Sequence, residues 1–222
     1  MASAARLERA AGAAVRIGVD FDNTLVSYDT LFHRVALEQG VIPADLPRTK
    51  LAVREHLRRE GREEIWTEMQ GTVYGARMSE AQAYAGAIEF LRWASARGIA
   101  LSIISHKTRH PFIGPKYDLH QAARQWIERS LGAGARPLVD PADVHFELTR
   151  EDKLRRIAAA ACAWYIDDLP EILLAPSFPR EVRGVLFDPE SYHADQDQAA
   201  LLRLRSWNEI LGHFERECPP AR

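Results

Sequence analysis

Cysteine is scarce in this chain, and its scarcity excludes several kinds of protein. The sequence contains only two cysteines, Cys162 and Cys218, far apart along the chain. Two cysteines can form one disulfide but not a disulfide framework, and their spacing is not that of a metal site. A small disulfide-rich secreted domain and a cysteine zinc site are therefore excluded, and a reducing compartment is expected.

The chain also has no large excess of charge of one sign and no long apolar run. The 29 basic and 31 acidic residues leave a formal net charge of -2, so no broad basic field is present to attract nucleic acid. No apolar run approaches the roughly 20 residues that a membrane-spanning helix requires. Residues 1–14 lack the apolar segment of a secretory signal, and we interpret them as a flexible leader. We therefore expect a soluble, cytoplasmic protein that binds neither nucleic acid nor membrane.

The sequence does contain the pattern of an α/β protein. Its 222 residues, of which 46% are hydrophobic, suffice for one well-packed domain that carries a small insertion. Short apolar runs rich in β-branched residues are typical of buried strands, and they occur at residues 15–19, 99–104, 163–166 and 184–187. Segments with helical spacing separate these runs, which predicts a Rossmann-like parallel sheet with helices on both faces.

Residues 27–81 differ from the rest of the chain. Their apolar side chains recur at helical spacing, interrupted by prolines and a glycine, and strand-like alternation is absent. We predict a small α-helical cap over residues 27–81, and an α/β core formed by residues 15–26 and 82–222. Local residue patterns also predict the position of two helices. Ser79 precedes Gln82 by three residues, a capping-box pattern that predicts a helix start, and residues 201–214 predict a closing amphipathic helix.

Polar residues follow the predicted strands at the points where those strands end. Asp20, Ser105 and the pair Asp167–Asp168 each come directly after an apolar run. In an open parallel sheet the ligand site lies outside the carboxyl ends of the strands. We therefore expect these widely separated residues to converge on one crevice.

Asp20 and Asp22 place two carboxylates on the same side of an extended segment, because residues i and i+2 project alike. Two such anions repel each other unless a cation or a proton intervenes, and Mg²⁺ suits an all-oxygen site that also receives phosphate. One carboxylate can then attack phosphorus, while the other, if protonated, donates to the leaving oxygen and later accepts a proton from water. The alternative is that both aspartates only cap a turn.

Three further positions supply what phosphoryl transfer demands, which is mainly positioning and charge neutralisation. Asp167–Asp168 adds acid at a neighbouring strand end; alternatively the pair is a helix N-cap, reinforced by Pro170. Ser105 offers a hydroxyl to a phosphate oxygen, or is only a strand-end hydroxyl. Lys153 offers a mobile positive charge near the start of its helix.

The third of these positions is a single residue, Lys153, and charged residues are common at the start of helices. It is alternatively a solvated side chain, in which case Arg155 or Lys107 would take its place.

These residues match the four motifs of the haloacid dehalogenase superfamily in order, and the chain resembles that superfamily over residues 15–188. The first motif, strand-Asp-x-Asp-x-Thr-Leu, corresponds to residues 20–25. The others are a hydrophobic strand that ends in Ser105, a lone Lys153, and a strand followed by Asp167–Asp168. The resemblance implies an aspartyl-phosphate mechanism with Mg²⁺, and it implies that the helical insertion is a mobile cap that closes over the substrate.

The resemblance also implies a role for each matching residue. Asp20 would be the nucleophile and a metal ligand, and Asp22 the general acid/base, with its backbone carbonyl on the metal. Asp168 would bind the metal directly, with Asp167 second or bound through water. Members of the superfamily that act on carbon–halogen bonds lack the second aspartate, so Asp22 favours phosphoryl chemistry.

Ser105 and Lys153 would hold the transferring phosphoryl group. The segment after Ser105 is rich in basic residues, and His106, Lys107 and Arg109 are candidates for binding an anionic substrate; alternatively this segment is a solvated loop. We therefore expect a phosphatase that acts on a small phosphorylated metabolite. A phosphotransferase or mutase of the same superfamily, or a catalytically silent binding module, is the alternative.

Overall fold

The computed structural model describes residues 15–132, 137–193 and 201–217. The predicted leader, residues 1–14, and Cys218 lie outside the described residues. Contacts divide the chain into two units. We call Met1–Leu25, Tyr84–His106 and Arg136–Arg222 the sheet unit, and Val26–Ala83 with Lys107–Ala135 the helical unit. Each unit is described by itself.

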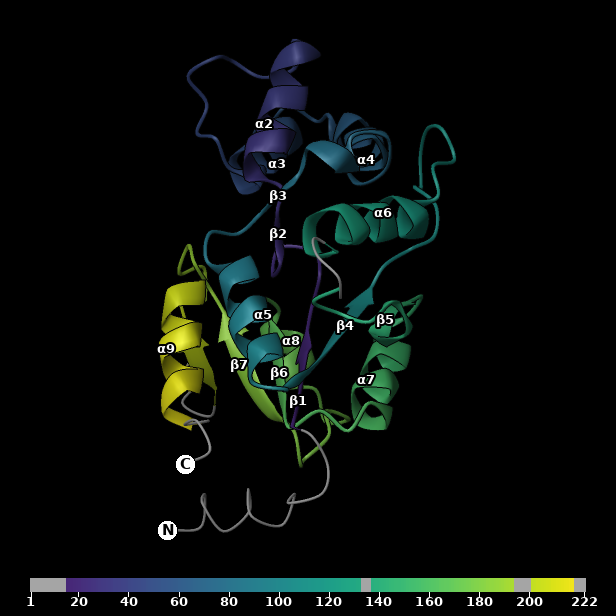
Figure 1. Cartoon of the computed structure of the whole chain (residues 1–222). Helices are drawn as coiled ribbons and strands as arrows, with labels where there is room; N and C mark the ends of the chain where they lie inside the picture. The colour runs from purple at the N-terminus through teal and green to yellow at the C-terminus, as the bar shows by residue number, and fades with distance from the viewer. Residues whose placement is uncertain (1–14, 133–136, 194–200, 218–222) are drawn as a thin grey trace. The chain divides into compact units, whose positions relative to one another are not determined.

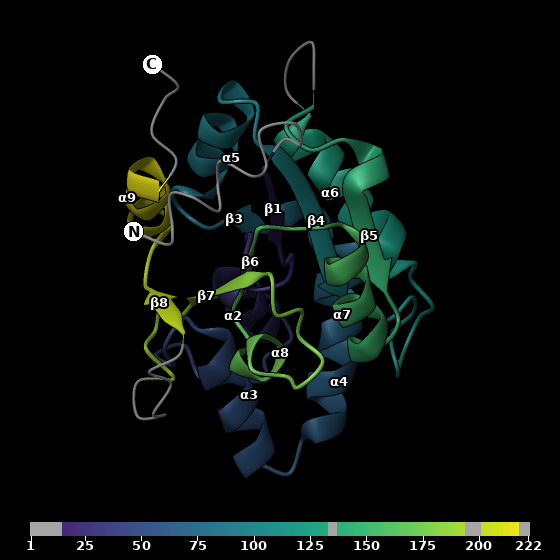
Figure 2. The same cartoon turned by 90° about the horizontal axis from the view of Figure 1, so that it is seen from below.

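The sheet unit is built on a six-stranded sheet with the strand order β5-β4-β1-β6-β7-β8, and Figures 1 and 2 show its course. Every neighbouring pair in it is parallel. The strands are β1 (Arg16–Val19), β4 (Ala100–His106), β5 (Val144–Glu147), β6 (Trp164–Asp167), β7 (Arg183–Phe187) and β8 (Leu202–Leu204). The predicted Rossmann-like α/β fold is thus confirmed.

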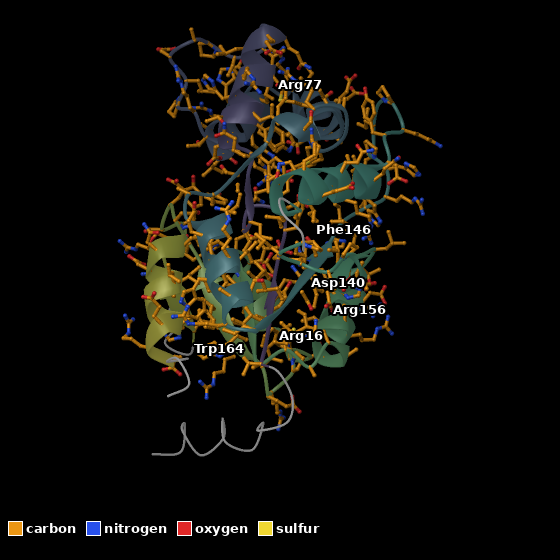
Figure 3. The ribbon with its side chains drawn as sticks, viewed as in Figure 1. Arg16, Arg77, Asp140, Phe146, Arg156 and Trp164 are labelled. Carbon is orange, nitrogen blue, oxygen red and sulfur yellow. The ribbon has the colours of Figure 1, made fainter. Side chains whose placement is uncertain are left out.

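Helices cover both faces of this sheet (Figure 2), as the sequence predicted. They are α5 (Ala87–Ala96), α7 (Arg150–Ala159), α8 (Pro170–Leu173) and α9 (Trp207–Glu217), with a short 3-10 turn, η4 (Pro141–Asp143), before β5. On one face α5 meets α9, where the rings of Phe90 and Phe214 lie 5.3 Å apart. Trp164 of β6 points to the same helix, 5.2 Å from Phe214, and Figure 3 labels it.

The opposite face packs Tyr165 and Leu186 against apolar side chains of α7 and α8. Successive residues of β6, Trp164 and Tyr165, thus pack into opposite layers, as the period of a strand requires. The Tyr165 ring passes over β1 at Gly18, where an added Cβ would lie 2.7 Å from the ring. The Tyr165 hydroxyl donates to the carbonyl of Ile104 at 2.5 Å. A glycine at position 18 is therefore what lets the ring reach β4.

The helical unit contains α2 (Asp29–Glu38), α3 (Lys50–Arg59), α4 (Glu63–Gly71), the π-helical turn η2 (Thr72–Ala76), the 3-10 turn η3 (Met78–Glu80) and α6 (Leu119–Leu131). A two-stranded antiparallel ladder pairs β2 (Val26–Ser27) with β3 (Gln82–Ala83). Phe32 and Trp66 stack at 4.7 Å in its core.

The helical unit includes residues 107–135, which the sequence analysis assigned to the α/β core. Trp126 of α6 donates its indole N–H to the carbonyl of Ala81 at 2.8 Å, and Gly75 lies against Tyr117 so closely that a Cβ would meet it at 2.5 Å. These contacts join segments far apart in the sequence, and no local pattern signals them.

Two predicted helix limits are wrong. The Ser79–Gln82 signal does not begin a helix, because Gln82 pairs with Ser27 in the β2–β3 ladder. Helix α5 begins only at Ala87, after Gly86, whose φ of 86° is a left-handed conformation that glycine adopts without strain.

The predicted closing helix over residues 201–214 also starts later than expected. Leu202–Leu204 pairs in parallel with β7 as the sixth strand. Helix α9 then begins at Trp207, where Ser206 accepts the backbone N–H of Glu209 at 3.1 Å, as an N-cap serine does. Within the described part of the chain, no helix combines the length and the apolar character needed to cross a membrane.

Candidate active site

The loop after β1 carries the first aspartate into the sheet unit's interior. Asp20 follows Val19 directly, and its backbone N–H donates to the carbonyl of Ile166 on β6 at 2.9 Å. Its side chain is buried, whereas Asp22, two residues on, is half-buried. The chain then turns through Asn23, which has a positive φ of 59°. The loop thus separates a buried carboxylate from a more accessible one.

The acidic pair at the end of β6 lies beside Asp20. Asp167 is fully buried and Asp168 is half-buried. Asp20, Asp167 and Asp168 each offer one carboxylate oxygen, and these three oxygens all lie within 4.8 Å of one another. The alternative interpretation of the pair as a helix N-cap is wrong, because Leu169 occupies that position of α8 and no side chain caps it.

Lys153 reaches this carboxylate cluster from α7, and its side chain is buried rather than solvated. Its Nζ lies 2.7 Å from Oδ1 of Asp20 and 2.6 Å from Oδ2 of Asp167. Thr149 caps the helix by accepting the N–H of Asp152 at 3.0 Å, so the helix start is well defined. One ammonium group therefore holds two carboxylates from different strand ends.

The electrostatics of the cluster follow from burial and from these ion pairs. Burial raises the pKa of Asp20, and the neighbouring charge of Asp167 raises it further, while Lys153 opposes both. Burial alone would lower the pKa of Lys153, but Asp167 and Asp20 outweigh it and raise that pKa. Lysine therefore stays protonated, and one positive charge faces three carboxylates. Such an excess of anionic oxygen ligands could hold a metal ion.

Thr24 ties the first loop to the acidic pair. Its hydroxyl donates to Oδ1 of Asp168 at 3.0 Å and accepts the backbone N–H of the same residue at 3.1 Å. Trp207 of α9 donates its indole N–H to the carbonyl of Thr24 at 3.0 Å. The sequence analysis gave no role to Thr24, although its place in the first motif was a signal. No local pattern signals the contact of Trp207 with the loop.

Ser105 lies at the carboxyl end of the neighbouring strand. Val19 of β1 is in register with Ile103 of β4, so Asp20 and Ser105 both follow that pair at the same edge of the sheet. Ser105 is buried. His106 is exposed; its Nε2 lies 3.1 Å from the carbonyl of Leu148, and partial burial lowers its pKa.

The two other candidates for substrate binding, Lys107 and Arg109, belong to the helical unit. Arg109 forms an ion pair with Asp118, with 3.1 Å between Nη2 and Oδ2. Lys107 is buried, and its carbonyl accepts from Nε2 of His120 at 2.8 Å. Between β4 and α6 the chain is irregular. Hydrogen bonds and an ion pair thus hold parts of the basic segment, while Arg109 and residues 112–116 are exposed.

A fourth strand-end aspartate shows how a structural carboxylate differs. Asp188 follows β7 and is buried, but its oxygens accept the backbone N–H groups of Tyr192 at 2.9 Å and of His193 at 3.2 Å. Its carboxylate therefore serves the turn after β7 and is not part of the cluster around Asp20.

Comparison with known proteins gives matches only at the level of structure. No family model and no curated protein sequence matches the chain. A predicted phosphatase from Clostridium acetobutylicum matches with a TM-score of 0.58 at 15% identity, covering 91% of this chain and 99% of that chain. A HAD family hydrolase from Deinococcus radiodurans with bound phosphate and sodium matches with a TM-score of 0.54 at 16% identity, covering 94% and 99%.

A dehalogenase is among the similar structures too, with a TM-score of 0.55 at 12% identity and coverage of 91% of this chain and 97% of that one. At these identities the likeness is one of fold, and it spans both units. The chain therefore has the fold of the haloacid dehalogenase superfamily, as its four motifs predicted.

Proposed function

We propose that this protein is a Mg²⁺-dependent phosphatase that hydrolyses a small phosphomonoester through an aspartyl-phosphate on Asp20. The observation that carries the proposal is the cluster of Asp20, Asp167 and Asp168 around the buried Lys153. A buried carboxylate is costly unless it is paired. Lys153 pairs with Asp20 and orients it, and a bound cation would lower the pKa that burial raises. These are the requirements of a carboxylate nucleophile.

The donor set fits a magnesium ion. Three carboxylate oxygens lie within 4.8 Å of one another, and hard oxygen ligands are what Mg²⁺ prefers. Asp20, Asp167 and Asp168 would hold the ion, together with the backbone carbonyl of Asp22. When bound, the ion would neutralise charge on the phosphoryl group and between the carboxylates. Lys153 already neutralises part of that charge, and its raised pKa keeps it protonated at neutral pH.

The reaction follows from the two carboxylates of the first motif. A carboxylate oxygen of Asp20 attacks phosphorus, the bond from phosphorus to the alcohol oxygen breaks, and Asp22 donates its proton to that oxygen. Asp22 then accepts a proton from water, which attacks phosphorus and releases phosphate as Asp20 is regenerated. Ser105 and Lys153 hold the phosphoryl oxygens, since positioning and charge neutralisation dominate this chemistry.

Asp22 favours a phosphatase over a dehalogenase. An alkoxide leaving group needs a proton in the transition state, and a half-buried carboxylic acid two residues after the nucleophile can supply it. A departing halide needs none. The proposed chemistry therefore uses a residue that dehalogenation would leave without a role.

The proposal is tested by phosphate release from a panel of phosphorylated metabolites with Mg²⁺. We expect turnover that is lost in Asp20→Asn and in excess chelator, and restored when Mg²⁺ is added back. Asp188→Asn is the matched control, because Asp188 is also a buried strand-end aspartate but binds the turn after β7. A folded Asp188→Asn protein should keep its activity. Full turnover in Asp20→Asn or in chelator would overturn the proposal, and isomerised product in place of phosphate would indicate a mutase.

A further inference from the structure

The hydrogen bond between His106 and Leu148 fixes which nitrogen of the imidazole ring carries hydrogen. Nε2 of His106 lies 3.1 Å from the carbonyl oxygen of Leu148. A carbonyl oxygen only accepts, so Nε2 must donate, and in the neutral ring Nδ1 then keeps its lone pair. Within the described part of the chain, Nδ1 of His106 has no hydrogen-bond partner. The exposed ring therefore presents a hydrogen-bond acceptor to a ligand.

The His106 ring is neutral at and above pH 7. A histidine with an ordinary pKa of about 6.5 is already mostly neutral there, and burial lowers the pKa of His106. The charges of Lys153 and Arg150 lower this pKa further, whereas the carbonyl of Leu148 and the charge of Asp22 oppose the shift. The ring thus offers a lone pair at Nδ1 rather than a positive charge.

Strand periodicity places this ring on the face of the sheet that α7 covers. Residues 104 and 106 of β4 project to the same side, because side chains alternate along a strand. Ile104 packs with Leu154 and Ile157 of α7. His106 therefore projects toward the layer from which Lys153 enters the carboxylate cluster.

The end of β5 brings His106 beside the loop of the first motif. Phe21 of that loop packs edge-on against Phe146 of β5, with 5.5 Å between the ring centroids, and Figure 3 labels Phe146. Phe146 is in register with Ser105, so His106 lies one position further along the same pair of strands. All of these residues belong to the sheet unit. His106 therefore stands at the carboxyl edge of the sheet, next to the serine proposed to bind phosphate.

A neutral acceptor selects its ligand by the donor that it requires. A hydroxyl group can donate to Nδ1, whereas an ionised carboxylate or phosphate oxygen has only lone pairs to offer. A site built to hydrogen-bond a substrate hydroxyl discriminates against the analogue that lacks it. Hydroxyl groups near the phosphate are what polyol phosphates and sugar phosphates have in common.

We propose that Nδ1 of His106 accepts a hydrogen bond from a hydroxyl group of the substrate, and that the substrate is a polyol phosphate or a sugar phosphate. This inference rests on the proposed function. It assigns His106 a hydroxyl group in place of the anionic group that the sequence analysis expected there. His106 determines specificity by orienting the leaving group, and it takes no part in the bonds that form and break.

The experiment compares probes in which a methyl group replaces one hydroxyl hydrogen. 2-Hydroxyethyl phosphate is paired with 2-methoxyethyl phosphate, and 3-hydroxypropyl phosphate with 3-methoxypropyl phosphate. The ethers keep the oxygen lone pairs, which a positively charged ring would still bind, but they cannot donate to Nδ1.

The kcat/KM of the active protein is measured near pH 7.5 with Mg²⁺, where the ring is neutral, and binding to Asp20→Asn is measured by calorimetry. We expect at least one hydroxyl probe to be preferred over its ether by roughly 3- to 10-fold, the value of one neutral hydrogen bond. Equal values within both pairs would overturn the inference.

Two variants of nearly equal shape assign the preference to His106. His106→Leu removes the acceptor and should abolish the preference, with the ether unchanged within about twofold. His106→Asn restores an acceptor, Oδ1, near the place of Nδ1 and should keep most of the preference. His110→Leu is the control, because His110 is an exposed histidine of the basic segment, and it should leave the preference unchanged.

Two outcomes of the variants would contradict the inference. A preference that persists in His106→Leu would come from the bulk of the methyl group. Equal weakening of both probes in His106→Leu, without rescue in His106→Asn, would mean that His106 has only a structural role.

The two proposals fail in different ways. Release of phosphate from hydroxyl and ether probes at equal rates would refute the hydroxyl site and leave the phosphatase intact. A preference in binding to Asp20→Asn that depends on His106, with no phosphate release by the active protein, would support the site and refute the phosphatase.

Discussion

Lys153 shows how one residue can fix both the charge and the geometry of a site. Its ammonium group contacts Asp20 and Asp167, and all three side chains are almost completely buried. A buried ion pair contributes little net stability when compared with a well-packed apolar group, but removing one partner leaves an uncompensated charge. At this site two carboxylates depend on a single lysine.

We therefore expect Lys153→Met to lower the free energy of unfolding by about 3–5 kcal/mol and to abolish turnover. Urea unfolding at neutral pH in chelator measures the first effect. The double variant Lys153→Met/Asp20→Asn should regain part of the lost free energy of unfolding, because one buried carboxylate fewer is then left without its lysine. Arg155→Met is the control, since Arg155 is an exposed residue of the same helix. An unchanged urea midpoint in Lys153→Met would contradict the buried pairing.

Asp22 is expected to act on the leaving group, and the size of its effect should depend on that group. Asp22→Asn should slow hydrolysis of an alkyl phosphate by roughly 10²–10⁴-fold, as the loss of a general acid does. Formation of the aspartyl-phosphate from an aryl phosphate with an acidic phenol should slow much less, because that oxygen leaves without a proton. Rapid-quench measurement of this step compares the two substrates. An equal loss for both would assign Asp22 a different role.

At the scale of elements, the sheet depends on a close approach between β1 and β6. Gly18→Ala would place a Cβ 2.7 Å from the Tyr165 ring and 2.9 Å from Sγ of Cys162. We expect a loss of about 1–3 kcal/mol, the usual cost of overpacking a core. Gly184→Ala on β7 is the control, because its Cβ would meet the mobile end of Leu173 at 3.2 Å. Thermal unfolding of both variants should show the larger loss at position 18, and equal losses would contradict this account.

The helices and strands that could be predicted from the sequence are those marked by a local residue pattern. The strands that end at Asp20, Ser105 and Asp167 are short, continuous apolar runs, and the edge where they meet follows from parallel topology. The late start of α9 could not be predicted, because Leu202 and Leu204 fit a helical pattern as well as a strand until their pairing with β7 is known. Tertiary pairing overrode local propensity there.

Contacts between residues far apart in the sequence could not be predicted. Lys50 carried no sequence signal, since only the fold brings it to the ring of Tyr74. Trp207 likewise reaches the carbonyl of Thr24 from the far end of the chain. By contrast, the sequence did single out Lys153, from its position before the acidic pair. It did not show which two carboxylates the Lys153 ammonium group contacts.

On the scale of the whole molecule, the two units have separate cores. Phe90, Phe214 and Trp207 pack together in the sheet unit, whereas Phe32 and Trp66 stack in the helical unit. The carboxylate cluster belongs to the sheet unit alone. A ligand that binds only the folded form stabilises the part that holds its site. A metal bound at the cluster should therefore stabilise the sheet unit more than the helical unit.

We expect Mg²⁺ to raise the unfolding transition of the sheet unit more than that of the helical unit. At a concentration of 100 times Kd the gain is about 2.7 kcal/mol. Variants that retain only Trp207, or only Trp66, report the two units separately by fluorescence during urea unfolding. Mg²⁺ should move the Trp207 transition and leave the Trp66 transition nearly unchanged, and Asp168→Asn should weaken the first shift because it removes a ligand. Equal shifts in both reporters would mean that the units unfold as one cooperative body, with the metal stabilising the whole chain.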